Sequence, residues 1–190
     1  MPSLSLMKKQ LLAITVISVL VTGCAAPARV DQMTSTKIPS ANAQAAALKS
    51  SIQIQSVTGG KSTNPLWTSQ VSSEAFQSAL STSLNSAGLL GTTTAPYTLD
   101  SKLVSLKQPK IGLDMTVTAT VDYQLTNTSS KESVFKKTIV TPYTATMGDA
   151  FVGTERLKLA NEGAIRKNIE EIIDVLLNAK LQDGQISVAP

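Results

Sequence analysis

Residues 113–126 constrain the fold more than any other stretch of the chain, because apolar and polar residues alternate there without a break. Every second residue from Leu113 to Leu125 is apolar, and each residue that follows one of these is polar. Only a backbone that repeats every two residues places the first set on one side and the second set on the other. The pattern predicts a long β-strand in a sheet with one buried face and one polar face.

Three other segments carry shorter strand patterns. The first covers residues 52–57 and ends before a pair of glycines. The second, over residues 97–106, changes phase near its end, which indicates a β-bulge. In the third, over residues 134–146, Pro142 cannot donate a hydrogen bond, so it must interrupt the strand or lie at a sheet edge. The chain is therefore expected to supply four strands.

Two segments show the three- and four-residue spacing of apolar side chains that is typical of an amphipathic helix. The first lies over residues 71–87, and Gly88 fits its C-terminal cap. The second runs over residues 154–181. Its polar side carries Glu162 and Arg166 at the spacing of a surface ion pair.

The element order strand, helix, strand, strand, strand, helix predicts a two-layer α+β sandwich over residues 51–182. Two helices suffice to cover one face of a four-stranded, mainly antiparallel sheet, and the opposite face is too polar to bury. A domain of this size buries about two-thirds of its unfolded surface, which is enough for it to fold alone. Residues 183–190 are expected to form a frayed tail.

The composition limits the chemistry of the chain. It contains no histidine and a single cysteine, Cys24, so it lacks the commonest acid–base side chain and cannot form an internal disulfide. Asp100, Asp114 and Asp122 fall on the polar side of strands, where solvated carboxylates are expected. Catalysis by carboxylates or by a serine–lysine pair stays open as an alternative. We predict a protein that is not an enzyme and that needs neither a metal nor a cofactor.

Nucleotides and nucleic acids are not expected partners. Residues 59–62, Gly-Gly-Lys-Ser, match the end of a phosphate-binding loop, but Gln55 stands where that motif requires a glycine. Residues 63–65 also separate the motif from the helix that should follow it directly. The formal charge of +4 includes Lys8 and Lys9 of the N-terminal segment and falls to +2 without them.

The first 24 residues combine a charged start, a short apolar run and small residues before the cysteine. Lys8 and Lys9 precede residues 11–21, an uncharged and mostly apolar run about half as long as the ~20 residues of a membrane-spanning helix. This arrangement is typical of an export signal. It resembles a bacterial lipoprotein signal in which Val21-Thr22-Gly23-Cys24 is the lipobox.

The resemblance implies a signal peptide over residues 1–23, cleavage between Gly23 and Cys24, and acyl chains such as palmitate on Cys24. Two or three such chains make release from a membrane negligible. Because Ala25 rather than an aspartate follows Cys24, the resemblance also implies an anchor in the outer membrane, with the domain in the periplasm. An ordinary secretory signal near a free Cys24 is the alternative.

Residues 24–50 contain many small residues, two prolines and few large apolar side chains. This composition is typical of a flexible linker, whose r.m.s. span would be roughly 28 Å. We therefore expect the lipidated Cys24 to be followed by a flexible tether that lets the domain stand off the membrane.

The order of a lipidated cysteine, a strand, a helix ending near residues 86–89, three strands and a long final helix is similar to the lipopolysaccharide-assembly lipoprotein LptE. It is similar, more loosely, to auxiliary lipoproteins of envelope ABC transporters. The resemblance implies a non-catalytic accessory or scaffold in cell-envelope assembly or transport, with an envelope protein as partner. The long tether and the motif at residues 149–157 depart from that family. The alternative is a lipid- or small-ligand-binding lipoprotein with a cavity between helices and sheet.

Five lysines near strand ends and turns are candidates for contact with anionic lipid head groups or lipopolysaccharide phosphates. They would act as one basic patch if they converge at one end of the sheet, and scattered, solvated lysines are the competing interpretation. Trp67 is expected to pack against the start of the first helix. The five lysines are Lys107, Lys110, Lys131, Lys136 and Lys137.

Overall fold

The computed structural model of the chain describes residues 24–36, 47–65, 68–182 and 185–187. The predicted signal peptide, with the cleavage-site residue Gly23, and Trp67 lie outside these residues. In the described part of the chain, no helix is both long enough and apolar enough to cross a membrane.

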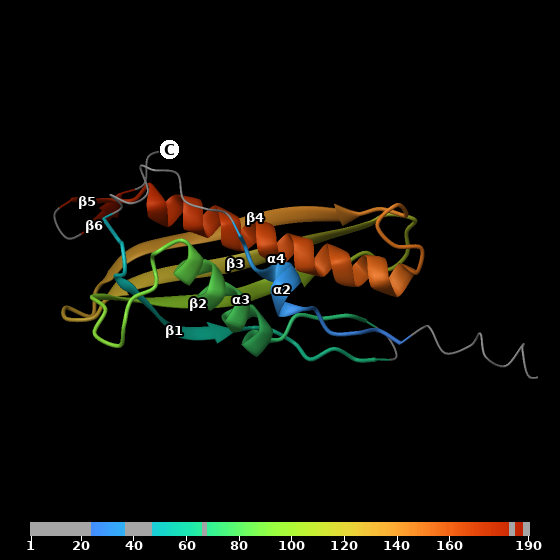
Figure 1. Cartoon of the computed structure of the whole chain (residues 1–190), viewed down its shortest axis with the longest axis horizontal. Coiled ribbons are helices and arrows are strands. Elements are labelled where there is room, and N and C mark those ends of the chain that lie inside the picture. Colours follow the sequence, from blue (N-terminus) through green and yellow to red (C-terminus); the bar gives the residue numbers. More distant parts are fainter. Residues whose placement is uncertain (1–23, 37–46, 66–67, 183–184, 188–190) are drawn as a thin grey trace, which may run out of the picture.

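The sheet contains four strands in sequence order: β1 (Ile52–Thr58), β2 (Tyr97–Lys107), β3 (Met115–Asn127) and β4 (Ser133–Ala145) (Figure 1). β3 is antiparallel to both of its neighbours, whereas β1 is parallel to β2. The sheet is therefore mixed but mostly antiparallel, and helices pack against it. This confirms the predicted α+β architecture.

The connection between β1 and β2 explains why this pair is parallel. Helix α3 (Ser73–Ser86) carries the chain from the end of β1 back to the start of β2, as a parallel pair requires. The Ser72 hydroxyl caps the helix by accepting a bond from the Ala75 backbone N–H at 3.1 Å. Gly88 follows the last turn with a φ of +70°, as its predicted role at the C-terminal cap requires.

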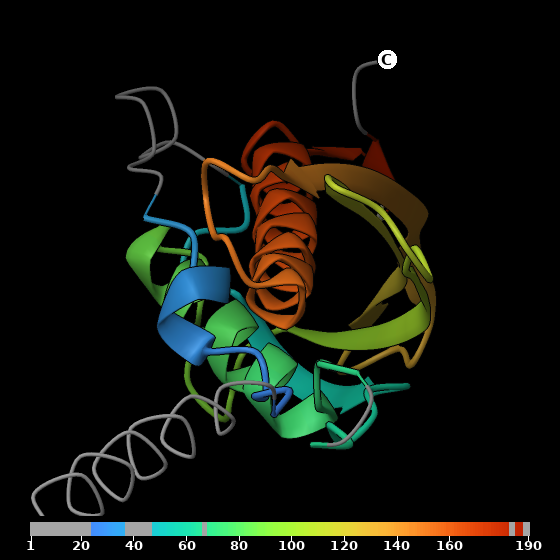
Figure 2. The same cartoon turned by 90° about the vertical axis from the view of Figure 1, so that its right-hand side faces the viewer.

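The second long helix, α4 (Gly153–Leu177), lies on the side of the sheet that curves around it (Figure 2). It ends at Leu177 rather than at residue 181, because the Asn178 side chain donates to the Asp174 carbonyl at 2.8 Å and closes the last turn. Of the tail expected to fray, residues 183–184 and 188–190 lie outside the described part, whereas residues 185–187 belong to a strand. β5 (Lys180–Gln182) and β6 (Gln185–Ser187) form a short antiparallel pair.

The core lies between the sheet and the helices. Alternate residues of β3 from Val117 to Leu125 are buried, as the alternation predicts, and Phe76 of α3 and Ile165 of α4 are fully buried in the same core. The predicted bulge is present in β2, next to Leu103. β4 runs through Pro142 without a break because it is an edge strand.

Leu113 departs from the predicted pattern, because its side chain is 74% exposed. β2 ends at Lys107 and β3 begins only at Met115, so residues 108–114 form a loop that extends past the sheet. The alternation in the sequence therefore begins two residues before the strand does.

Residues 24–36 pack on the domain, which differs from the flexible tether predicted over residues 24–50. The short helix α2 (Val30–Met33) lies against α3 and α4 (Figure 1). Small side chains are compatible both with a segment packed on a shallow surface and with a flexible linker. Composition alone therefore did not distinguish a packed segment from a linker. Residues 37–46 lie outside the described part. The buried side chains of this region are Ala25, Ala28, Met33, Ser35 and Leu48.

Candidate functional site

One face of the sheet is covered by none of the described helices, and we call it the uncovered face (Figure 2). It carries two neighbouring cross-strand rows of polar side chains. One row consists of Ser56, Asp100, Gln124 and Lys136. The adjacent row consists of Thr58, Lys102, Asp122 and Thr138. Each row contains one acid and one base, so the two rows balance in charge. We call these eight residues the polar face.

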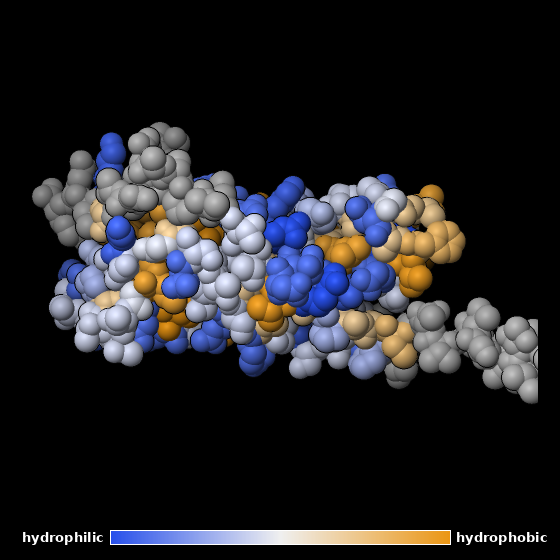
Figure 3. Space-filling model, viewed as in Figure 1, coloured by the Kyte–Doolittle hydropathy of each residue, from blue (hydrophilic) through white to orange (hydrophobic). Residues whose placement is uncertain are grey.

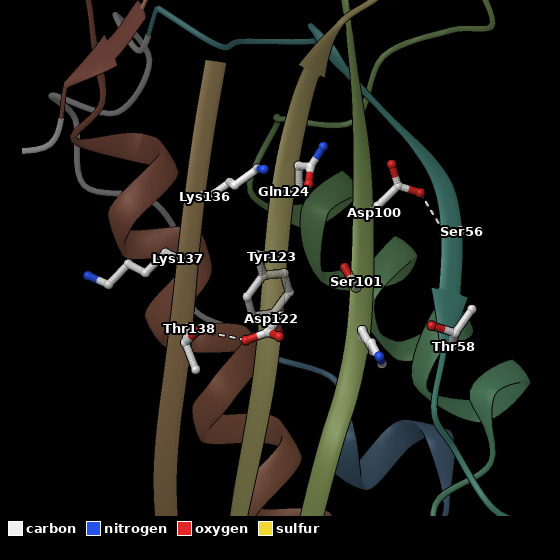
Figure 4. Close-up of a pocket in the computed structure, with 11 residues that line it drawn as sticks. Ser56, Thr58, Asp100, Ser101, Asp122, Tyr123, Gln124, Lys136, Lys137 and Thr138 are labelled. Atoms are coloured by element: carbon white, nitrogen blue, oxygen red, sulfur yellow. Dashed lines mark hydrogen bonds between the residues drawn. The ribbon is translucent and has the colours of Figure 1, made fainter. Parts of the chain in front are cut away.

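The two-residue repeat of the strands turns these side chains away from the helices. Two hydroxyls hold the carboxylates: Ser56 Oγ donates to Asp100 Oδ1, and Thr138 Oγ1 donates to Asp122 Oδ1 at 2.6 Å (Figure 4). Figure 4 also shows Lys136 extending toward Gln124. The polar face is therefore ordered by contacts between strands.

A depression of about 540 Å³ lies over the polar face and is open to solvent. Its charged side chains can form charge-assisted hydrogen bonds with a partner that carries charges of both signs. Among the described residues, no group of three or more aspartate, glutamate or cysteine side chains is placed to hold a metal ion. The arrangement is that of an open, charged surface rather than of an enclosed site.

The rest of the uncovered face is less charged. Val104 on β2 and Val140 on β4 are 50% and 55% exposed, and Lys107 lies at the margin of this region. The sheet surface thus has a charged half and a half made of hydroxyls and apolar groups. The other side chains of the second half are Thr116, Thr118, Thr120, Pro142 and Thr144.

The five candidate lysines do not converge at one end of the sheet. Lys107 and Lys110 lie where β2 ends, whereas Lys131 lies in the β3–β4 turn at the opposite end, because β2 and β3 run antiparallel. Lys136 belongs to the polar face. Lys137 also lines the depression over this face, but its side chain extends away from Asp122 and Gln124 (Figure 4). Contact of individual lysines with anionic lipid stays a prediction.

A lipid- or small-ligand-binding protein would need a cavity between the helices and the sheet. Packed side chains lie there instead. The buried Tyr123 hydroxyl donates to Asn168 Oδ1 at 2.9 Å. Asn168 Nδ2 donates in turn to the Ile139 carbonyl at 3.1 Å and the Thr141 hydroxyl at 3.0 Å. Burial, and to a lesser extent the charge of Glu171, raises the pKa of Tyr123. This network joins α4 to the sheet.

The candidate lipidation residue, Cys24, is exposed and lies next to backbone that is fixed on the domain. The Ala25 N–H donates to the Pro65 carbonyl at 2.8 Å, and the Ala28 N–H donates to the Gln70 carbonyl at 3.2 Å. A lipid attached to Cys24 would therefore lie close to the folded domain.

Glu162 does not form the predicted surface pair with Arg166. Its side chain is 1% exposed and binds Arg29, with Arg29 Nη2 at 2.9 Å from Glu162 Oε2. Arg166 instead donates to the Gln32 carbonyl at 2.7 Å. Both arginine contacts hold residues 24–36 on α4.

A group of exposed apolar side chains was missed by the sequence reasoning (Figure 3). They belong to the β2–β3 loop, residues 108–114, and to the β4–α4 loop, residues 146–152. Leu113 was assigned to the alternation that leads to β3, and the other four lie next to glycines and charged residues outside any regular apolar repeat. We call this group the apolar tip: Ile111, Leu113, Met147, Phe151 and Val152.

No protein-family model and no curated protein matches the sequence. Solved structures that resemble the fold include protein XCC0632 of family DUF330 from Xanthomonas campestris, at 13% identity and a TM-score of 0.48 over 67% of this chain and 81% of that one. A dodecameric PelC from Paraburkholderia phytofirmans has 15% identity and a TM-score of 0.47 over 70% and 89% of the two chains. A minor lipoprotein from Acinetobacter baumannii has 8% identity and a TM-score of 0.46 over 68% and 93%. At these values the likeness transfers neither a family nor a function to this chain.

Proposed function

We propose that the chain is a non-catalytic lipoprotein of the bacterial cell envelope, anchored through Cys24 in the outer membrane with its domain in the periplasm. It acts as an accessory or scaffold in envelope assembly or transport and docks an envelope protein on its polar face. The lipobox pattern at Val21-Thr22-Gly23-Cys24 supports the anchor. The uncovered sheet face supports the docking role.

The observation that carries the docking role is the pairing of charges across the polar face. Asp100 and Lys136 share one row, and Lys102 and Asp122 share the next. Such a pattern selects a partner surface with complementary charges of both signs, whereas a uniformly charged polymer would meet repulsion at every second position. A folded protein surface supplies this complementarity, and the neighbouring Val104 and Val140 add apolar contact.

The alternative function, binding of a lipid or other small ligand, is supported less well. A lipid-binding site buries most of its ligand among apolar side chains. The depression over the polar face is open to solvent and is lined by charged and hydroxyl-bearing residues. The arrangement therefore favours a protein partner over a buried ligand.

Photo-crosslinking in intact cells tests the proposal. A photoreactive amino acid at Thr120, at the centre of the uncovered face, is compared with one at Asn85, an exposed position on α3. The proposal expects a discrete protein adduct from position 120 and none from position 85. The charge reversal Asp122→Lys should abolish the adduct while leaving the protein in the membrane fraction. Equal adducts from both positions, or an adduct that survives the charge reversal, would contradict the docking role.

A further inference from the structure

The apolar tip combines side chains from two loops at one end of the molecule. The loops lie together because β2 and β4 end there while β3 and α4 begin there. Ile111 is 92% exposed, Phe151 is 85% exposed and Leu113 is 74% exposed. Single exposed apolar residues are ordinary on a protein surface, but several large ones gathered at one end of a molecule, as in Figure 3, indicate an interaction site.

The β4–α4 loop is held in place by polar contacts on its inner side. Arg156 Nη1 donates to the carbonyls of Ala150 and Phe151, at 2.8 Å and 2.6 Å. Asp149 Oδ2 accepts bonds from the N–H and the hydroxyl of Thr146, at 2.7 Å and 2.9 Å. These side chains thus form hydrogen bonds with the loop backbone, while the apolar side chains of the loop remain exposed. The loop is arranged to present them to a partner.

Cys24 lies at the same end of the molecule. The first described segment, residues 24–36, is drawn in blue in Figure 1 and extends toward the end of the molecule where the two loops project. A path of hydrogen bonds connects the two features: the Ala28 N–H donates to the Gln70 carbonyl, and the Gln70 side chain donates to that of Gln108 at 3.4 Å. Gln108 begins the β2–β3 loop. The segment that follows Cys24 and the apolar tip therefore lie toward the same end of the molecule.

The surface charges at this end are nearly balanced. Lys107 and Lys110 are exposed there, and so are the acidic Asp114 and Asp149. Attraction to anionic lipid head groups would consequently be weak, since acids offset the lysines. Transfer of apolar side chains out of water is the larger driving force.

We infer that the apolar tip inserts into the acyl boundary of the bilayer that holds the lipids of Cys24, so that the domain docks end-on against the membrane. The inference rests on the proposed lipid anchor. Acyl chains on Cys24 bring the bilayer to this end, because Ala25 is already hydrogen-bonded to the domain. The tip adds a second, apolar attachment next to the covalent one, and the two together fix the orientation of the polar face toward the periplasm.

Spin-label accessibility in vesicles tests the inference. The mature lipidated protein carries Phe151→Cys and is reconstituted into phosphatidylcholine vesicles. The thiol at position 151 is free for labelling, whereas the Cys24 sulfur is bonded to the diacylglyceryl group. A matched control carries Ser129→Cys in the exposed β3–β4 turn at the opposite end. We expect the label at position 151 to collide with oxygen, which dissolves in lipid, about tenfold more than with a water-soluble nickel chelate, relative to the label at position 129.

A second variant separates insertion of the tip from insertion of the label itself. Ile111→Ser with Leu113→Ser, added to the Phe151→Cys protein, should move the label back toward water. A label at position 151 that stays in water while the protein floats with the vesicles would overturn the inference and leave the anchor standing. Burial that appears only when anionic lipid is present would overturn it as well, because the lysines would then hold the tip. Failure to float would refute the anchor, and the inference would fall with it.

Discussion

Arg29 holds Glu162 with three N–H groups: its backbone N–H and Nε reach Oε1 at 2.8 Å and 3.0 Å, and Nη2 reaches Oε2 at 2.9 Å. The carboxylate lies on α4, 133 residues away in sequence, and is almost completely buried. The bidentate contact, chiefly its hydrogen bond, raises the pKa of Arg29. This pair joins the segment that follows Cys24 to the longest helix of the domain.

Replacing Arg29 should leave the Glu162 carboxylate without its partner. We expect Arg29→Ala to lower the free energy of unfolding by about 1–2 kcal/mol, because Glu162 is buried and loses its partner while the Arg29 side chain is itself 44% exposed. Urea denaturation of the full chain measures this. The added change Glu162→Gln removes the buried charge and should restore part of the loss. An unchanged midpoint for Arg29→Ala would show that the contact does not hold the segment.

Asn168 is expected to stabilise the fold through its buried hydrogen bonds rather than through its packing. Asn168→Leu keeps a similar volume but leaves the buried hydroxyl of Tyr123 without its acceptor, so we expect a loss of about 2 kcal/mol. Tyr123→Phe should cost less on its own. Combined with Asn168→Leu, it should cost almost nothing further, because the unsatisfied hydroxyl is then gone. Additive losses in this double-mutant cycle would disagree with the network.

At Gly163, α4 approaches the ring of Tyr143 so closely that an added Cβ would lie 2.3 Å from a ring atom. Alanine normally stabilises a helix relative to glycine by about 1 kcal/mol. Here we expect Gly163→Ala to destabilise the protein by about 1–2 kcal/mol instead, because the ring must move. In a Tyr143→Ala background the same change should become neutral or stabilising. Thermal unfolding of the four proteins compares the two cases.

The β4–α4 loop should respond to acid through Asp149. Hydrogen bonds from the backbone N–H and the hydroxyl of Thr146 lower the pKa of this carboxylate from its ordinary 3.8. Because the pKa of Asp149 is lower in the folded protein, its ionised carboxylate stabilises the folded state fully above pH 3.8. This stabilisation is lost as the pH falls through the folded-state pKa. Hydrogen exchange of residues 146–150 should rise in that range, and Asp149→Asn should remove the dependence. A pH profile identical in both proteins would contradict this role.

The regular elements could be predicted because their signals are local. The uninterrupted alternation that leads to β3 admits one backbone repeat, and Pro142 restricts β4 to an edge. Gly88 likewise fixes the end of α3, since an αL residue there needs no long-range information. In each case the residues that predict the feature lie within a few positions of it in the sequence.

The tertiary pairings could not be predicted in the same way. Glu162 and Arg166 have the spacing of a helical ion pair, yet the true partner of Glu162 comes from the N-terminal segment. Lys107 and Lys131 both stand near strand ends, but only the antiparallel order of β2 and β3 shows that these are opposite ends. The rows of the polar face likewise depend on register, and each of the three strand pairs in the sheet contains a register shift.

Intact-mass analysis of the protein extracted from cell membranes tests the central claim of a lipid anchor most directly. We expect a mature chain that starts at Cys24 and carries the added mass of a diacylglyceryl group, while Cys24→Ser yields no lipidated species. A mature chain that begins elsewhere, with Cys24 present as an unmodified thiol, would contradict the anchor and the membrane orientation derived from it.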